Sequence, residues 1–499
     1  MSRRWNAALW VPVGVASALA VAAFVGPPES VVRERPAQDE AVVRSTLVCP
    51  YAGGEARASS HIGVLPLGGP DGVPDGAEVP PVVVQPLVGT EAEPSTLLSA
   101  TAVGTLATAE VDAADATAYA VRGTGVLAPG LAAEQSMLAQ GPDFRGLVTA
   151  HCAAPAREHW FVGASGEVGR RGRLVLSNPT PVAAVVDVSV WDESGPVDAP
   201  ATADVAVPAQ GQEILLLDAL DADAQQIGVR VTASRGRVAA ALEVRETADL
   251  DPQGVSFVPA AAEPATDIVV PGVPGHGQRL LRVLAPGDRD AIVSLRLLGP
   301  DGPFSPVDQD VLTVTAGTVL EVAITEAAGE AAVSVSLSSD VPVTAAVRVV
   351  DAPSDALPDL AYTAATAPLS GTASALLGRI GSDLTTRLLV STVGGMPARV
   401  AVRTLAVDGT VAAEQTVDVP GGSTVPVALE LPEGASWATI VVEPAEPGTV
   451  TVTREIVGSN SAGALLDLMP LVAPAVTVQV PEVVGELPTG LAPAGPITR

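Results

Sequence analysis

The sequence contains no lysine, so all 27 of its basic residues are arginine. Schiff-base chemistry, P-loop nucleotide binding and kinase-type phosphoryl transfer each depend on a lysine amine at a defined position. The sequence therefore excludes these classes of enzyme. Histidine is also scarce, and only four residues of this type could serve as a general base or a metal ligand.

Aromatic residues make up only 3% of the chain, although 47% of it is hydrophobic. Valine, alanine and leucine must therefore fill the cores, and 48 glycines with 45 prolines indicate many short strands joined by turns. Sites that cleave sugars usually have aromatic platforms, which this chain has few residues to build. We expect Trp191 and Trp437 to pack in cores, because each lies on or at the start of an alternating strand.

The chain also carries much less positive than negative charge, which gives a formal net charge of −29. An acidic surface repels phosphate backbones, so the composition argues against nucleic-acid binding. The acidic residues are dispersed along the chain, which indicates a solvated exterior.

The amino-terminal segment predicts export from the cytoplasm. Residues 1–6 carry Arg3 and Arg4 and precede an uncharged apolar run, residues 7–25, that is nearly long enough to cross a bilayer. This run has two interpretations. It is either an uncleaved signal anchor, which forms the transmembrane helix of a single-pass membrane protein, or a signal peptide that is removed to leave a secreted protein. Residues 26–40 are expected to form a polar stalk, with the bulk of the chain in the cell envelope.

The chain has two cysteines, Cys49 and Cys152. Outside the cytoplasmic membrane two such cysteines usually pair, so we predict a disulfide bond between them. The bond would close a loop of roughly a hundred residues and stabilise the protein by about 4 to 5 kcal/mol in the chain-entropy model.

A repeat of about 105 residues emerges after residue 165, with Asp/Gly turns at Asp192 to Gly195, Asp301-Gly302 and Asp408-Gly409. Segments such as "VAAVVDVSVWD" alternate polar and apolar residues, as a two-sheet sandwich requires. The fold class is therefore predicted to be all-β, with tandem immunoglobulin-like β-sandwich domains behind one amino-terminal transmembrane helix. The expected domains are a β-rich amino-terminal domain (41–165), three sandwiches (166–262, 263–365 and 366–475) and a Pro/Gly-rich tail (476–499). One segment, residues 131–140, favours a short helix.

The stretch "TAHCAAPAREHWFVG", residues 149–163, holds the densest group of reactive side chains. His151 and His159 flank Cys152 without a third group to orient them, and a disulfide would remove the thiolate. The structural interpretation is simpler, with Cys152 as a staple and Trp160 and Phe161 covering a core. We assign no catalytic, cofactor-binding or metal-binding residue.

Other candidate sites are weaker. Ser165 and Ser461 lack the nucleophile-elbow pattern of serine hydrolases. Two acidic segments, 218–223 and 249–251, do not fit the EF-hand loop, although calcium clamps between sandwiches remain an alternative.

Several segments together resemble a known family: Cys49-Pro50, Cys152 with residues 160–163, and Leu174 to Pro179 within "GRLVLSNPTP". This family is actinobacterial, membrane-anchored or secreted, and described only as a domain of unknown function (DUF5719). The resemblance implies an envelope location and no agreed activity, so no catalytic residue is carried over.

These observations favour a non-enzymatic, membrane-anchored cell-envelope protein, a rod of sandwiches acting as a scaffold or partner-binding surface. No cofactor is expected, and envelope proteins or cell-wall glycan are the possible partners. The alternatives are a glycan-binding or envelope-polymer-enzyme accessory module and an uncharacterised hydrolase. The sequence does not determine the ligand or the oligomeric state.

Overall fold

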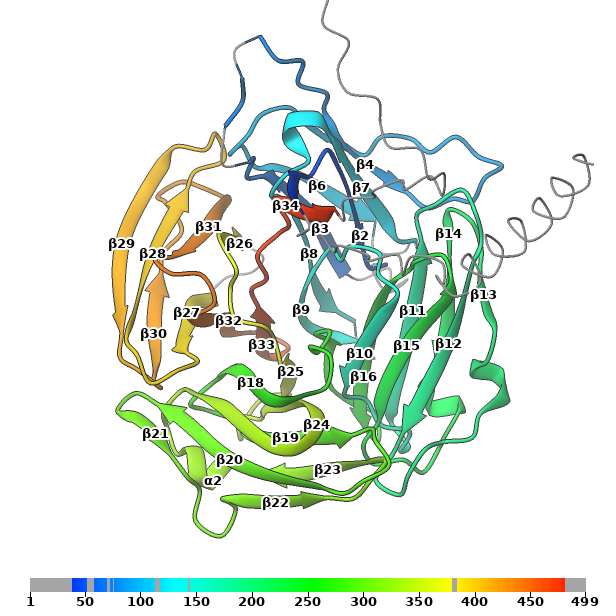
Figure 1. The fold of residues 1–499 in the computed structure, drawn as a ribbon, viewed down its shortest axis with the longest axis vertical. Coiled ribbons are helices and arrows are strands. Elements are labelled where there is room, and N and C mark those ends of the chain that lie inside the picture. The colour runs from blue at the N-terminus through cyan, green and yellow to red at the C-terminus, as the bar shows by residue number, and fades with distance from the viewer. Residues whose placement is uncertain are drawn as a thin grey trace, which may run out of the picture. The chain divides into compact units, whose positions relative to one another are not determined.

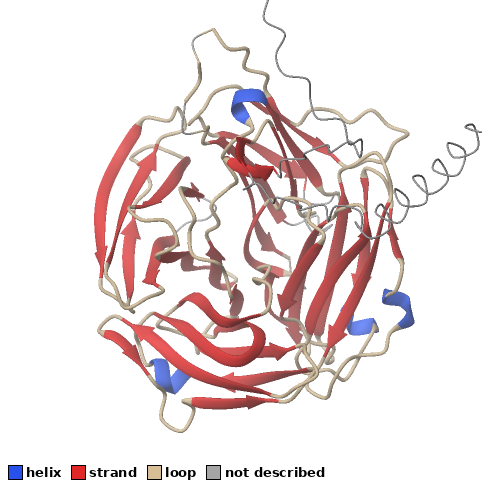
Figure 2. Ribbon diagram, viewed as in Figure 1, coloured by secondary structure: helices blue, strands red, loops and turns tan. Residues whose placement is uncertain are grey.

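Alternating aliphatic and polar side chains produce short strands along the whole described chain. Val186, Val188 and Val190 of strand β12 (Ala184–Trp191) are buried, while Asp187 and Ser189 between them are exposed. A computed structural model describes residues 38–51, 58–69, 72–74, 76–112, 117–141, 144–378 and 384–480. Helices in these ranges are limited to single turns (Figure 2). The prediction of an all-β protein is therefore confirmed.

The strands of residues 41–476 group into four modules, each with one hydrophobic core. The strands of module 1 are β2 (Arg44–Cys49), β3 (Ala58–Pro66), β4 (Val82–Pro86), β5 (Leu98–Ala100), β6 (Ala107–Asp112), β7 (Tyr119–Thr124), β8 (Leu131–Gln140) and β9 (Arg145–His151). Those of module 2 are β10 (Glu158–Val162), β11 (Arg170–Asn178), β12, β13 (Val205–Val207), β14 (Gly211–Leu216), β15 (Gly228–Arg235), β16 (Ala239–Ala248) and β17 (Asp251–Val258).

Modules 3 and 4 follow in the same order along the chain. Module 3 contains β18 (Ala265–Val273), β19 (Gln278–Ala285), β20 (Ala291–Gly299), β21 (Gly302–Phe304), β22 (Val311–Val314), β23 (Thr318–Ala323), β24 (Val333–Asp351) and β25 (Asp359–Ala364). Module 4 contains β26 (Ala373–Gly378), β27 (Leu384–Thr392), β28 (Ala398–Leu405), β29 (Val411–Val419), β30 (Thr424–Leu429), β31 (Trp437–Pro444), β32 (Val450–Asn460) and β33 (Gly463–Pro470). The helical turns are η1 (Gly125–Leu127), η2 (Pro200–Thr202), η3 (Leu217–Ala219) and α2 (Thr325–Ala328).

All four modules share one strand order. In modules 1, 2 and 4, the first, sixth, third and fourth strands form one sheet, and the fifth, second, seventh and eighth form the other. Module 3 has the same order, except that the 19-residue strand β24 runs through both sheets and replaces two strands. The sequence pattern predicts a separate β-rich domain for the first module, but its strand order is that of a fourth copy of the repeat.

The last strands of the modules bring all four modules together. Strand β9 contacts β17, β17 contacts β25, β25 contacts β33, and β33 contacts β9. Within residues 41–476 the modules therefore close into a ring around these four strands (Figure 1). A rod in which each sandwich touches only its chain neighbours is therefore wrong for this region, because the first and fourth modules are in contact.

Two local predictions are corrected by strand pairing. Residues 131–140 form strand β8 instead of a helix, because they pair on one side with β3 and on the other with β9. Residues 158–162 form β10, which pairs with β15 and so belongs to module 2, before the expected boundary at residue 165.

Two terminal strands form a separate two-stranded sheet, β1 (Gln38–Ala41) with β34 (Thr477–Val480). The predicted apolar span, residues 7–25, the cytoplasmic end and most of the stalk and tail lie outside the described residues. Among the described residues, no helix has the length and apolar character needed to span a membrane.

Candidate functional site

Modules 1, 2 and 4 line a partly open apolar cavity of about 400 Å³ next to the ring's inner strands. Its walls include residues 131–133 and 149–154 of module 1, residues 239–241 and 257–260 of module 2, Thr366, Ser374, and residues 468–470 and 472–475. Alanine, valine, leucine and proline dominate these walls. The cavity is the place where part of the reactive stretch 149–163 meets the other modules.

The predicted disulfide bond is present and borders this cavity. Cys49 ends strand β2, Cys152 directly follows β9, and their sulfurs are 2.00 Å apart. The bond joins the two sheets of module 1, and both cysteines are buried. Cysteine at position 152 is therefore a structural staple and not a thiolate nucleophile.

The two histidines of the stretch are held separately. His151 Nε2 donates to the carbonyl oxygen of Pro470 at 3.1 Å, and His159 Nε2 donates to that of Val238 at 2.8 Å. Burial lowers the pKa of His151 to about 4, with the charge of Arg454 adding to the effect, and burial also lowers the pKa of His159. Both rings are therefore neutral at pH 7.

Trp191 packs in a core, as its place on an alternating strand predicts, whereas Trp437 lies at a half-buried position instead of in a core. Trp160 and Trp191 stack with ring centroids 5.7 Å apart, and they pack with Leu284 and Val319 between modules 2 and 3. Trp437 is half-buried, with its ring 5.2 Å from that of His61.

A buried ionic cluster closes the ring between modules 4 and 1. Arg454 on β32 donates to Glu134 on β8 at 2.6 Å and to the hydroxyl of Thr149 at 2.6 Å, and it lies 3.6 Å from Asp467 on β33. Burial raises the pKa of the Glu134 carboxyl and raises that of Asp467 to about 6. One buried guanidinium thus contacts two buried carboxylates.

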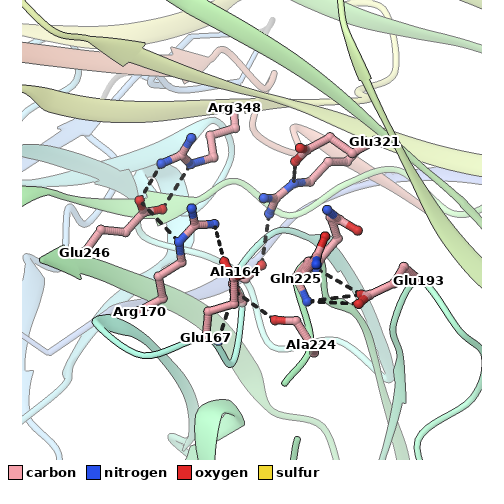
Figure 3. A network of polar contacts seen from close by, with 12 residues as sticks. Ala164, Glu167, Arg170, Glu193, Ala224, Gln225, Glu246, Glu321 and Arg348 are labelled. Atoms are coloured by element: carbon pink, nitrogen blue, oxygen red, sulfur yellow. Dashed lines mark hydrogen bonds and ion pairs between the residues drawn. The ribbon is translucent and has the colours of Figure 1, made fainter. Parts of the chain in front are cut away.

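A second ionic cluster joins modules 2 and 3 (Figure 3). Glu246 on β16 faces Arg348 on β24 and accepts a hydrogen bond of 3.0 Å from its Nε. Arg282 on β19 donates to Glu321 at 2.8 Å and reaches the carbonyl oxygen of Ala164 in module 2 at 2.9 Å. Buried charged groups therefore recur on the strands that face a neighbouring module.

Polar side chains also connect the two remaining pairs of neighbouring modules, module 1 with module 2 and module 3 with module 4. Between modules 1 and 2, the hydroxyl of Tyr51 donates to Glu243 at 3.0 Å, and burial raises the pKa of Tyr51 to about 12. Between modules 3 and 4, His276 Nε2 hydrogen-bonds Glu455 at 2.9 Å, and the nearby carboxylates of Asp351, 3.8 Å from Nδ1, and Glu455 raise the pKa of His276 to about 9.

Three glycines and one aspartate lie at or near the starts of the four last strands. Gly146, Gly254 and Gly463 have φ values of +144°, +128° and +142°, which disfavour residues with a side chain. Asp359 holds the fourth position. A Cβ added at Gly146 or Gly254 would lie 2.7 Å or 2.6 Å from Asp359 Oδ1, so these glycines make room for the carboxylate.

Asp359 itself connects three modules. Its Oδ2 accepts backbone hydrogen bonds from Leu147 of β9 at 3.1 Å and from Leu466 of β33 at 3.0 Å. Burial raises the pKa of this carboxyl to about 8, although the two backbone donors and the charge of Arg145 oppose the shift.

The metal and nucleophile candidates do not converge. No three histidine, cysteine, aspartate or glutamate side chains within the described ranges could share a metal ion, the acidic segments 218–223 and 249–251 included. Ser165 donates to the carbonyl oxygen of Ala224 at 2.9 Å and makes no bond to a histidine in this part of the structure.

The sequence alone did not predict the ionic clusters or the role of Asp359 in joining modules. A signal was present, because Glu134, Arg454 and Asp467 interrupt otherwise apolar strands in "LAAEQSML", "VTVTREIV" and "ALLDLMP". A charge at an inward position requires a partner, but the sequence does not say which one.

The fold and the site define an all-β protein of repeated β-sandwich modules that are joined by polar clusters, with an apolar cavity lined by modules 1, 2 and 4. A model of a family of unknown function (DUF5719) matches residues 107–430, and the chain belongs to this family. No curated protein matches the chain.

Proposed function

We propose that this protein is a non-enzymatic scaffold of the cell envelope that holds partner-binding edges in fixed positions. In this proposal the modules are immunoglobulin-like, residues 7–25 anchor the chain in the cytoplasmic membrane, and the ring faces outward. The observation that carries the proposal is ring closure through buried polar contacts, because contacts at every junction restrict movement between modules.

Strand β29 is the edge best suited to a partner. It ends its sheet, and six consecutive residues, 411–416, are exposed. The corresponding edge strands β5, β13, β21 and β22 have only three or four residues. An exposed edge of this length offers backbone groups for pairing with an extended polypeptide.

The glycan-binding alternative has less support. The described tryptophans and tyrosines, Trp160, Trp191, Trp437, Tyr51, Tyr119 and Tyr362, are buried or half-buried. They therefore provide no exposed aromatic platform on which a sugar ring could stack.

The absence of lysine allows a site-specific test of the scaffold. Gln415→Lys on β29 adds a single side-chain amine, and Val307→Lys in an exposed loop of module 3 is the matched control. An amine-reactive cross-linker applied to intact membranes should capture one defined envelope polypeptide through position 415 and not through position 307.

Two results would count against the proposal. Equal capture from both positions would remove β29 as the binding edge. Release of sugars or peptides from cell-wall fractions by the purified full chain would show an enzyme instead of a scaffold.

A further inference from the structure

The cavity between the modules has room for a ligand because its walls are built from small side chains. Ala132, Ala133 and Ala150 form part of the wall from module 1, and Ala239 and Ala241 form part of it from module 2. The cavity is partly open, and its volume of about 400 Å³ lies within the range of small-molecule sites.

The walls carry no charge. Among the described residues, no arginine, aspartate or glutamate lines the cavity, and His151 is its one titratable group. The carbonyl oxygen of Pro470 can only accept, so His151 Nε2 carries the proton of this hydrogen bond. In the neutral ring Nδ1 is then an acceptor, and no hydrogen bond between described residues ends on it.

These features select for one kind of ligand. Placing a carboxylate, phosphate or ammonium group against such walls would bury a charge without a partner. An aliphatic chain loses no hydrogen bonds there, and a hydroxyl group could donate to His151 Nδ1.

We propose that this cavity binds an uncharged, largely aliphatic molecule with a hydroxyl group, of the class of long-chain alcohols. Because its walls come from more than one module, the bound molecule contacts several modules at once. It thereby stabilises the closed ring, a role that goes beyond the proposed scaffold function.

A photoreactive analogue of 1-dodecanol with a diazirine on its chain tests this assignment. The full chain, held in lipid nanodiscs, is irradiated with the probe, and labelled peptides are identified by mass spectrometry. We expect adducts on residues 131–133, 149–154 and 239–241, and competition by 1-dodecanol that is about tenfold stronger than by dodecanoate.

Two filling variants from different modules, Ala241→Trp in module 2 and Ala150→Leu in module 1, should each lose most of this labelling. Ala248→Trp, at an exposed position on the same strand as Ala241, should keep it. Circular dichroism identifies which variants are folded. Because there are two filling variants, the test still works if one of them does not fold.

Three outcomes would overturn the inference. They are full labelling of a folded filling variant, no labelling of the cavity in the unmodified chain, and equal competition by the alcohol and the carboxylate. Since the readout is the labelled position, the result does not depend on whether β29 binds a partner.

Discussion

Removing Arg454 should open the ring between modules 4 and 1. Its side chain is 1% exposed, while those of Glu134 and Asp467 are 5% and 3% exposed. Arg454→Met would keep the aliphatic volume but leave two buried carboxylates without a cation. Removing one partner of a buried ion pair typically costs about 3 to 5 kcal/mol, and we expect a loss of this size in the free energy of unfolding.

The loss should depend on pH. Without the guanidinium, burial and mutual repulsion raise the pKa values of both carboxyls further, so more free energy is needed to keep them ionised. The variant should therefore lose more stability at pH 8, where unfolded carboxyls are charged, than at pH 5, where the buried groups are protonated at a smaller cost.

Chemical denaturation followed by circular dichroism measures the loss, and small-angle X-ray scattering reports whether the ring opens. Arg399→Met is the matched control, since Arg399 and Asp418 form an ion pair whose side chains are 66% and 74% exposed. Its removal should cost about 0 to 1 kcal/mol. Similar losses in the two variants would refute the reasoning, and so would a ring-opened scattering profile for the control.

The double variant Glu134→Gln/Arg454→Met distinguishes the effect of the Arg454–Glu134 ion pair from the effect of the other contacts of Arg454. It should recover part of the stability that Arg454→Met loses, because it removes one of the two unpaired charges. No recovery would mean that Arg454 acts mainly through its bonds to Thr149 and the backbone.

The remaining predictions concern the disulfide bond, the glycine at position 254 and the pH dependence that Asp359 contributes. Replacing both Cys49 and Cys152 with alanine should lower the free energy of unfolding by about 4 to 5 kcal/mol, and a loss under 1 kcal/mol in chemical denaturation would contradict this assignment. Gly254→Ala should destabilise the protein by more than 1 kcal/mol, because φ is +128° and the Cβ would meet the Asp359 carboxylate, whereas Gly371→Ala, where nothing lies within 4 Å, should be nearly neutral in thermal unfolding. The Asp359 carboxyl has a folded pKa of about 8 against about 3.9 in an unfolded chain, so its contribution is fully present below about pH 4 and is lost as pH rises toward 8. Asp359→Asn should flatten this part of the stability profile, and an unchanged slope would argue against a raised pKa.

The candidate site was only partly predictable from the sequence. The disulfide followed from the number of cysteines and their expected compartment, and the packing role of Trp191 followed from its place on an alternating strand. The partner of Arg454 could not be predicted, because Glu134 lies 320 residues away and any acidic residue on a facing strand would satisfy the same charge.

The sequence by itself determined the strands and many of their turns, because alternation and Asp/Gly turn chemistry act over a few neighbouring residues. It also suggested a helix at residues 131–140. These residues form a strand instead, because pairing with strands on both sides outweighs their local helix propensity. Only the tertiary structure decided that module 1 is a fourth copy and that the modules close into a ring. Closure depends on contacts between residues hundreds of positions apart, such as Asp359 with Leu147, and no short-range pattern specifies these partners.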